Sequence, residues 1–305
     1  MYSLVIPVYN ERETIPTLHD RVKKVIDALD APAEVIVVED GGTDGSFELL
    51  KEIHRKDARF KVLSFSRNFG HQVAISAGIE HALGDAVMII DGDLQDPPEV
   101  LPQFISKWKE GYDVVYAIRT KRKENIFKRA AYAAFYRLLN RLSYLNVPLD
   151  SGDFCLMDKR VVDAMRMLPE RKRFVRGLRT WVGFRQVGLA YERDRRFAGE
   201  PKYTFGKLLA LAYDGIFSIS TTPLRVAVYI GFALAILAFL GGLLVIYGKL
   251  VYGIALAGWS STIVIITFLG GVTLSTLGMI GEYVSRIYDE VKSRPLYIVR
   301  EKLGL

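Results

Sequence analysis

Two aspartates, Asp91 and Asp93, stand one residue apart directly after Ala86–Ile90, an apolar run with the length of a buried strand. Two carboxylates on a tight turn suit a hard divalent cation, which prefers oxygen ligands and commonly also binds substrate phosphates. The alternative is that the segment only starts a helix, with Asp96 as its cap before two prolines. Because that alternative leaves Asp91 unexplained, we predict a site for Mg²⁺ or Mn²⁺ here.

Other apolar runs in the first 120 residues also end in polar side chains. Tyr2–Val8 leads to Glu11, and a run ending at Val38 leads to Asp40. Segments with helical spacing separate these runs. The expected strands are Tyr2–Val8, Glu34–Val38, Phe60–Phe65, Ala86–Ile90 and Asp113–Ile118, and the expected helices are Thr14–Leu29, Ser46–His54, Gln72–Ala82 and Pro98–Lys109. This alternation is typical of an α/β fold with a mostly parallel sheet covered on both faces, in which ligands bind beyond the carboxyl ends of the strands.

Two stretches near the C-terminus, Val226–Gly248 and Leu250–Gly281, contain no charged residue. Each is long enough to cross the roughly 30 Å hydrocarbon core of a bilayer, which takes about 20 helical residues. Lysines and arginines flank the pair, and the short connection holds only Lys249. The positive-inside rule therefore places both chain ends in the cytoplasm. We predict two transmembrane helices within 224–283 and a cytosolic tail over 284–305.

Two general features favour a cytosolic location for residues 1–220, and a third indicates a partner. Met1 leads directly into a strand-like run, without the pattern of a signal peptide. The single cysteine, Cys155, excludes an internal disulfide and suits a reducing compartment. The formal net charge of +7 is concentrated in basic segments, which together with the spans favours anionic lipid as the partner. We find no nucleic-acid motif and expect no nucleic-acid partner.

Two basic or aromatic segments are candidates for helices that lie in the membrane interface. Phe127–Leu145 mixes apolar side chains with lysine and arginine, which suits an interface, although a core-facing helix has the same pattern. Phe205–Ile219 is the second candidate, because aromatic side chains are frequent at membrane interfaces. We expect these interface helices at about 125–145 and 204–219, within a domain over 1–220.

Three segments resemble the successive motifs of the GT-A fold, family 2 inverting glycosyltransferases. They are Pro7–Glu11 (PVYNE), Glu39–Ser46 (EDGGTDGS) and Asp91–Pro98 (DGDLQDPP). The third is especially similar to that of the polyprenyl-phosphate glycosyltransferases, which include dolichol-phosphate mannosyltransferase and the bactoprenol glucosyltransferases. The two C-terminal spans fit the bactoprenol branch. The resemblance covers nearly the whole chain and implies a Rossmann-like GT-A sheet domain.

The resemblance also assigns site residues by position. A UDP-sugar would be bound by Pro7, Tyr9, Glu11, Asp40, Gly70, Gln72 and Asp91, with Asp40 accepting from the uracil N–H. The metal would be held by Asp91, Asp93 and Gln95, and the catalytic residues would be Asp153 and Asp93. The acceptor phosphate would contact Arg119, Arg129, Arg196, Lys202 and Tyr203. The alternatives are a turn aspartate at position 153 and general membrane attraction for the cations.

The sequence departs from the family pattern at two positions of the second motif. Glu39 stands where the first aspartate is usual, and Gly42 stands where serine is usual. We expect Glu39 to be tolerated, because the contact to uracil falls to Asp40. A lone histidine, His71, lies in the loop that resembles the one flanking the nucleotide. Because single histidines are more often structural than ligands, we expect a structural role for it.

Together these expectations describe an integral membrane enzyme of the bacterial plasma membrane. It would transfer one sugar, most simply glucose, from a UDP-sugar to polyprenyl (undecaprenyl) phosphate with inversion, as a homo-oligomer, with a tetramer as the expected form. A processive polysaccharide synthase is one alternative, but it needs more spans and a Gln-x-x-Arg-Trp motif, of which only Arg179–Trp181 is partly present. A nucleotide-binding membrane scaffold is the other. Because the UDP motifs precede residue 100, we expect nucleotide binding to survive removal of Val226–Leu305.

Overall fold

The computed structural model describes residues 1–119, 151–171, 173–192, 222–252 and 258–305. These residues fall into two compact units. One unit contains the described residues before 193 together with Arg294–Leu305, and the other contains the described residues from 222 to 293. The predicted interface helices at about 125–145 and 204–219 lie outside the described residues.

The first unit is built on an eight-stranded sheet with the order β7-β5-β6-β4-β1-β2-β3-β8. The strands are β1 (Tyr2–Val8), β2 (Ala33–Glu39), β3 (Phe60–Phe65), β4 (Ala86–Ile89), β5 (Val114–Arg119), β6 (Ser151–Asp158), β7 (Gln186–Tyr191) and β8 (Val299–Leu303). Most neighbours are parallel, but β6 runs antiparallel to β4 and β5, and β8 runs antiparallel to β3. The predicted mostly parallel α/β sheet is confirmed, with two reversed strands that the spacing of the sequence did not reveal.

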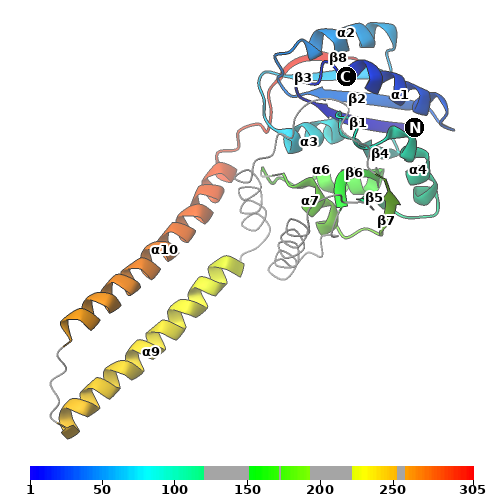
Figure 1. Cartoon of the computed structure of the whole chain (residues 1–305). Helices are drawn as coiled ribbons and strands as arrows, with labels where there is room; N and C mark the ends of the chain where they lie inside the picture. The colour runs from blue at the N-terminus through cyan, green and yellow to red at the C-terminus, as the bar shows by residue number, and fades with distance from the viewer. Residues whose placement is uncertain (120–150, 172, 193–221, 253–257) are drawn as a thin grey trace. The chain divides into compact units, whose positions relative to one another are not determined.

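Helices cover both faces of the sheet (Figure 1). The helices α1 (Ile15–Asp27), α2 (Ser46–Lys56) and α4 (Leu101–Lys109, after the 3-10 turn η1, Pro98–Val100) pack on one face, and α3 (His71–His81), α6 (Lys159–Arg166) and α7 (Val175–Trp181) pack on the other. Local signals fix where they begin. For example, the side chain of Asp158 caps α6 by accepting from the Arg160 N–H at 2.9 Å, which satisfies one of its unpaired amides.

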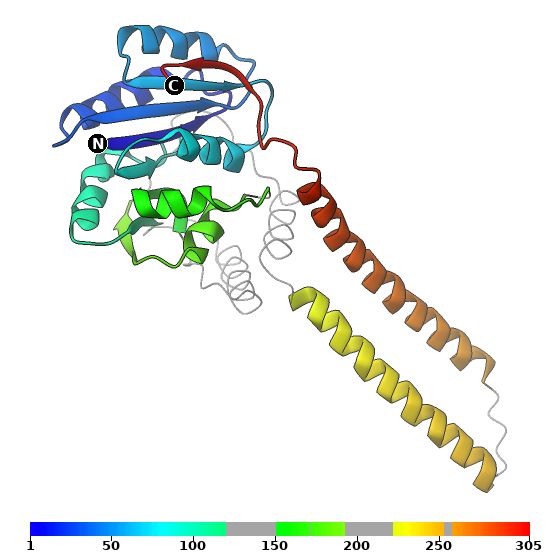
Figure 2. The same cartoon turned by 180° about the vertical axis from the view of Figure 1, so that it is seen from behind.

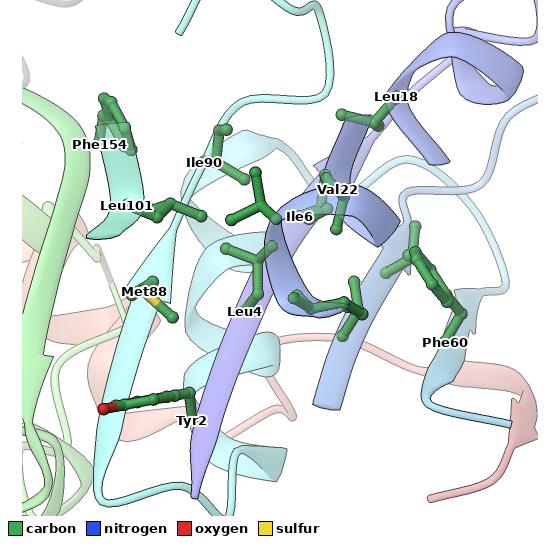
Figure 3. Close-up of a cluster of buried hydrophobic side chains, with 14 of the residues drawn as sticks. Tyr2, Leu4, Ile6, Leu18, Val22, Phe60, Met88, Ile90, Leu101 and Phe154 are labelled. Carbon is green, nitrogen blue, oxygen red and sulfur yellow. The ribbon is translucent and has the colours of Figure 1, made fainter. Parts of the chain in front are cut away.

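Strand β1 shows why the sheet has two cores. Its side chains alternate between faces, so Leu4 and Ile6 enter the core under α1, and Val5 enters the core under α3. Figure 3 shows the first core, in which Leu4 and Ile6 of β1 belong to the same cluster of buried side chains as Leu18 and Val22 of α1. All seven residues of β1 are buried, and a strand buried on both faces appears in the sequence as a continuous apolar run.

The last strand, β8, comes from the far end of the chain. It lies at the edge of the sheet beside β3, with Val62 opposite Leu303 and Phe65 opposite Val299 (Figures 1 and 2). The sequence pattern alone gave no structure to the tail over 284–305. The end of that tail is instead an edge strand of the first unit.

The second unit contains two long helices, α9 (Thr222–Tyr252) and α10 (Trp259–Val291). Within them, Leu224–Leu244 and Val264–Val291 have mean hydropathies of 2.4 and 1.9 and are long enough to cross a membrane. None of either stretch is buried inside the protein. The two helices overlap the charge-free stretches Val226–Gly248 and Leu250–Gly281 that predicted transmembrane segments, although α10 continues for ten residues past Gly281 into charged sequence.

Candidate active site

The predicted nucleotide motifs meet at the carboxyl ends of three neighbouring parallel strands, β4, β1 and β2. Val8 lies opposite Glu39, and the Asp40 N–H donates to the Val8 carbonyl at 2.9 Å. Pro7 lies within β1 opposite Val38, and the exposed Tyr9 follows directly after β1. The topology therefore gathers residues that are 30 to 80 positions apart in the sequence at one edge of the sheet, as expected for a parallel α/β fold.

Asp40 holds the loop that leads into α3. It is 3% exposed, and its two carboxylate oxygens accept the backbone N–H groups of Phe69 at 2.7 Å and Gly70 at 2.9 Å. Burial raises the pKa of Asp40, although these two hydrogen bonds oppose the shift. Gly70 immediately precedes α3 with φ of 101°, a conformation that favours glycine. Asp40 and Gly70, both predicted to bind nucleotide, are thus in direct contact.

Glu11 also helps to fix this edge of the sheet. Its carboxylate accepts the Thr14 hydroxyl at 3.1 Å, at the start of α1. Its N–H donates to the Ser46 hydroxyl at 3.2 Å, at the start of α2. Glu11 therefore joins the first and second motifs.

The acidic turn after β4 packs closely against the end of β1. A side chain at Gly92 would lie 2.9 Å from the Pro7 carbonyl, so only glycine allows this approach. Next to it, the Gln95 N–H donates to Asp93 Oδ1 at 3.1 Å. Leu94, between them, is buried and has φ of 58°, which is unusual for a branched side chain. The turn thus presents Asp91, Asp93 and Gln95 in a fixed backbone conformation.

The reversed direction of β6 brings Asp153 to this turn. Ile89 of β4 lies opposite Cys155 of β6 in an antiparallel pair. Continuing that register by two residues places Asp91 opposite Asp153. Asp153 therefore belongs to the same edge of the sheet as the acidic turn, as the resemblance implied, although the sequence did not indicate an antiparallel strand.

Two side chains hold the Asp153 carboxylate, which is 4% exposed. Arg176 of α7 donates from Nε at 2.8 Å and from Nη2 at 3.1 Å, and Gln72 donates from Nε2 at 3.0 Å. The side-chain oxygen of Gln72, Oε1, accepts the Val175 N–H at 2.9 Å, which connects α3 to the start of α7. Gln72 was predicted to contact nucleotide; the structure places it on Asp153.

The pKa values of the two aspartates in this cluster shift in opposite directions. Burial would raise the pKa of Asp153, but Arg176 and His71 outweigh it and hold that pKa well below the usual range. Burial, opposed by His71 and reinforced by neighbouring carboxylates, raises the pKa of Asp91 to about 6. Asp153 is therefore a firmly ionised partner of Arg176.

His71 lies between the two carboxylates, where the sequence had favoured a structural role. Its Nε2 is 3.4 Å from Asp91 Oδ1 and 3.6 Å from Asp153 Oδ2. Desolvation would lower the pKa of His71, but the two aspartates outweigh it and raise the pKa to about 9. His71 is thus a cation that links the acidic turn to Asp153.

The acidic turn fits a divalent cation that takes several of its ligands from a substrate. Asp91 Oδ1 is buried 3.4 Å from His71 Nε2 and accepts no hydrogen bond, so it retains lone pairs that a metal ion could use. Among the described residues, no group of three or more His, Cys, Asp or Glu side chains is arranged as a metal site. The donors that this turn could offer are the carboxylates of Asp91 and Asp93 and the Gln95 amide, and Mg²⁺ commonly completes such a set with water and phosphate oxygens.

The sequence analysis did not identify Arg176. Its signal was weak: Arg176 and Arg179 stand three residues apart on the short helix α7, which places two arginines on one face beside apolar residues. Of the predicted acceptor-phosphate residues, Arg129, Arg196, Lys202 and Tyr203 lie outside the described residues. Arg119 ends β5 opposite Tyr191, and its side chain is likewise outside the described part.

Comparison with known proteins identifies a family and relatives that match over nearly the whole chain. The sequence matches the model of glycosyl transferase family 2 over residues 3–166. It is 50% identical to the uncharacterized glycosyltransferase YkcC of Bacillus subtilis, covering 100% of this chain and 94% of that protein. It is 43% identical to the SfII prophage-derived bactoprenol glucosyl transferase of Shigella flexneri, covering 98% and 97%. Among solved structures, glucosyl-3-phosphoglycerate synthase from Mycobacterium tuberculosis in complex with uridine-diphosphate is 22% identical with a TM-score of 0.49, covering 72% and 79%.

Proposed function

The chain belongs to glycosyltransferase family 2, and we propose that it transfers a single glucose from UDP-glucose to undecaprenyl phosphate at the cytosolic face of a bacterial plasma membrane. The observation that carries this proposal is the meeting of Asp40, the acidic turn and Asp153 at one edge of the sheet. The full-length similarity to bactoprenol glucosyl transferases supports a polyprenyl phosphate as the acceptor.

The proposed reaction is one in-line displacement at the anomeric carbon. An oxygen of the acceptor phosphate forms the new bond to that carbon, the bond to the UDP oxygen breaks on the opposite side, and the configuration inverts. A phosphate monoester has its second pKa near 6, so the acceptor is largely ionised at neutral pH and needs no strong base. A divalent cation held by Asp91, Asp93 and Gln95 would supply Lewis-acid stabilisation of the departing diphosphate.

Asp153 then acts by position rather than by abstracting a proton. Its low pKa makes it a weak base, and both of its oxygens already accept hydrogen bonds from Arg176 or Gln72. Through those contacts it fixes Arg176 beside the acidic turn, where a cation suits the phosphates of donor and acceptor. Asp40 and Gly70, with Pro7, Tyr9 and Glu11, would form the uridine end of the site.

The membrane part of the proposal rests on α9 and α10. Both contain stretches apolar enough to cross a bilayer, and the basic residues outside them favour cytosolic ends. The acceptor tail would lie in the bilayer, with its phosphate contacting Arg119, Arg129, Arg196, Lys202 and Tyr203. We propose a homotetramer as the assembled form.

One assay separates this function from its two alternatives. Full-length protein in detergent is given radiolabelled UDP-glucose, undecaprenyl phosphate and Mg²⁺ or Mn²⁺, and the lipid and polymer fractions are counted. A lipid-linked monosaccharide supports the proposal. A polymer would indicate a processive synthase, and UDP-glucose binding without any product would indicate a scaffold. If another UDP-sugar labels the lipid instead, the choice of glucose is wrong.

A further inference from the structure

The C-terminal strand β8 lies beside the part of the sheet that leads into the nucleotide loop. It pairs with β3, and the Ser66 N–H donates to the Ile298 carbonyl at 2.9 Å just beyond the pair. The Tyr297 ring stacks on Phe65 with centroids 4.8 Å apart. The chain that follows Phe65 is the loop whose amides bind Asp40. The tail therefore contacts the segment on which the uridine end of the site depends.

Within this contact, Arg300 reaches a buried carboxylate, Glu39. Its Nη2 donates to the Ser64 hydroxyl at 2.9 Å and lies 3.6 Å from Glu39 Oε2. The Ser64 hydroxyl donates to the same Glu39 oxygen at 2.7 Å. The guanidinium also lies over the Phe47 ring, 4.7 Å from its centroid. The Arg300 guanidinium thus lies beside the Ser64 hydroxyl, the Glu39 carboxylate and the Phe47 ring.

Glu39 uses its other oxygen to hold the turn of the second motif. Glu39 is fully buried, and Oε1 accepts the Gly42 N–H. Because a buried carboxylate is costly unless it is paired, the hydrogen bonds and a nearby cation both favour this position of Glu39. Arg300 is the cation that the structure places against it.

The two departures from the family motif, Glu39 and Gly42, are in contact with each other. A side chain at Gly42 would begin 2.9 Å from Glu39 Oε1 and 2.8 Å from Asn10 Oδ1. The longer side chain of Glu39 therefore occupies the space that a serine at position 42 would need. A side chain at position 42 would therefore require the Glu39 or Asn10 side chain to move, and the Glu39 carboxylate instead accepts a hydrogen bond from the Gly42 N–H.

We propose that Arg300 is a positioning residue for the nucleotide, which acts through Glu39 on the turn Asp40–Gly42. By pairing with Glu39 it holds that carboxylate in place, and the turn that carries Asp40 keeps its conformation. This inference rests on the proposed function, because it takes the Asp40 site to bind UDP. It also makes the segment after the second apolar helix a part of the donor site.

The first test measures the affinity of the full-length protein for UDP by isothermal titration calorimetry in detergent. Arg300→Gln removes the charge, Arg300→Lys keeps it, and Lys302→Met is the matched control on the same strand, since Lys302 contacts His81 at 3.1 Å. Because Arg300 is partly exposed, we expect Arg300→Gln to weaken UDP binding about three- to tenfold. Arg300→Lys should recover most of this loss, and Lys302→Met should change the affinity by less than about twofold.

The second test asks whether the effect passes through Glu39. Glu39→Gln keeps an oxygen for the Gly42 N–H but removes the charge that Arg300 neutralises. In that background, Arg300→Gln should change UDP affinity by less than about twofold, because contacting residues are not additive. In turnover, Arg300→Gln should raise the KM for the UDP-sugar and leave kcat at saturating donor unchanged.

The outcomes keep this inference separate from the proposed function. A wild-type protein that binds no UDP contradicts the proposed function. A wild-type protein that binds UDP while Arg300→Gln binds it equally well, or an equal loss with and without Glu39→Gln, overturns the role of Arg300. If Arg300→Gln does not fold, Arg300→Lys decides: a loss of more than about threefold in UDP affinity despite the retained charge overturns the inference.

Discussion

Asp153 combines a low pKa, deep burial and a bidentate arginine, a combination that suits a fixed anion rather than a base. Its pair with Arg176 is anchored by Gln72, so the position of the guanidinium follows from the carboxylate. On the opposite side, His71 stands between Asp153 and Asp91. From the acidic turn to α7, the neighbouring charged side chains therefore alternate in sign: Asp91, His71, Asp153 and Arg176.

If Asp153 positions Arg176, Asp153→Asn should lower kcat by about 10- to 100-fold, and Arg176→Met should cost about as much. The double variant should be little worse than either single one, because the two side chains act as a unit. The acidic limb of the pH–rate profile should stay in place in Asp153→Asn, since the lowered pKa of Asp153 leaves it ionised throughout the assay range. Loss of that limb in the variant would show instead that Asp153 is the base.

Asp91→Asn should separate stability from activity. In the metal-free protein Asp91 Oδ1 is buried without a hydrogen bond near other carboxylates, but it also lies 3.4 Å from the His71 cation. The neutral amide relieves the first cost and loses the second interaction, so the unfolding temperature should change by no more than a few degrees. Activity with Mg²⁺ or Mn²⁺ should fall to background, as it should in the wild type with excess chelator. Thermal unfolding without metal and the radiolabel assay check both parts. Full turnover in chelator would exclude the metal role.

The elements that complete the site are the two strands that run against the rest of the sheet. The reversed β6 carries Asp153 to the acidic turn, and β8 closes the edge of β3. Tyr297, just before β8, stacks on Phe65, and its hydroxyl donates to Glu80 at 2.7 Å. This contact fastens the tail to α3 as well as to β3.

Tyr297→Ala should destabilise the first unit by about 2–3 kcal/mol, since it removes a stacked aromatic ring and a hydrogen bond. Tyr297→Phe keeps the ring and should cost only about 0.5–1.5 kcal/mol. Thermal unfolding of the full-length variants, followed by near-ultraviolet circular dichroism, measures both. Equal effects of the two substitutions would mean that the hydroxyl, rather than the ring, holds the tail.

At the scale of the whole molecule, the apolar helices α9 and α10 interrupt a unit that the chain completes after them. Residues Arg294–Leu305 belong to the first unit, although α9 and α10 precede them in sequence. Removal of Val226–Leu305 was expected to leave an intact nucleotide-binding domain. The structure shows that this deletion also removes β8 and with it the cation beside Glu39.

Two truncations test this organisation. The chain that ends at position 221 should bind UDP weakly and unfold at a lower temperature, because β3 loses its edge partner. The chain in which residues 222–293 are replaced by a flexible linker of about 20 to 30 glycines and serines should keep UDP binding. Both should use the lipid acceptor poorly. Equal UDP affinity in the two truncations would show that β8 is dispensable for the donor site.

The sequence alone determined the features that local pattern can encode. Continuous apolar runs marked β1 to β4 because those strands are buried on both faces, and polar residues at their ends marked the edge where the site lies. The motif around Asp91 and Asp93 indicated a glycosyltransferase of family 2. Two long charge-free stretches predicted the apolar helices α9 and α10.

Only the tertiary structure decided which distant side chains complete the site. The direction of β6 and the return of β8 depend on pairing between segments far apart in the chain, and a short strand shows neither its partner nor its direction in its own residues. Arg176 and Arg300 looked like two of many basic residues, because charge in a sequence does not show which carboxylate it faces. Nor could the sequence show that the fold places His71 between Asp91 and Asp153.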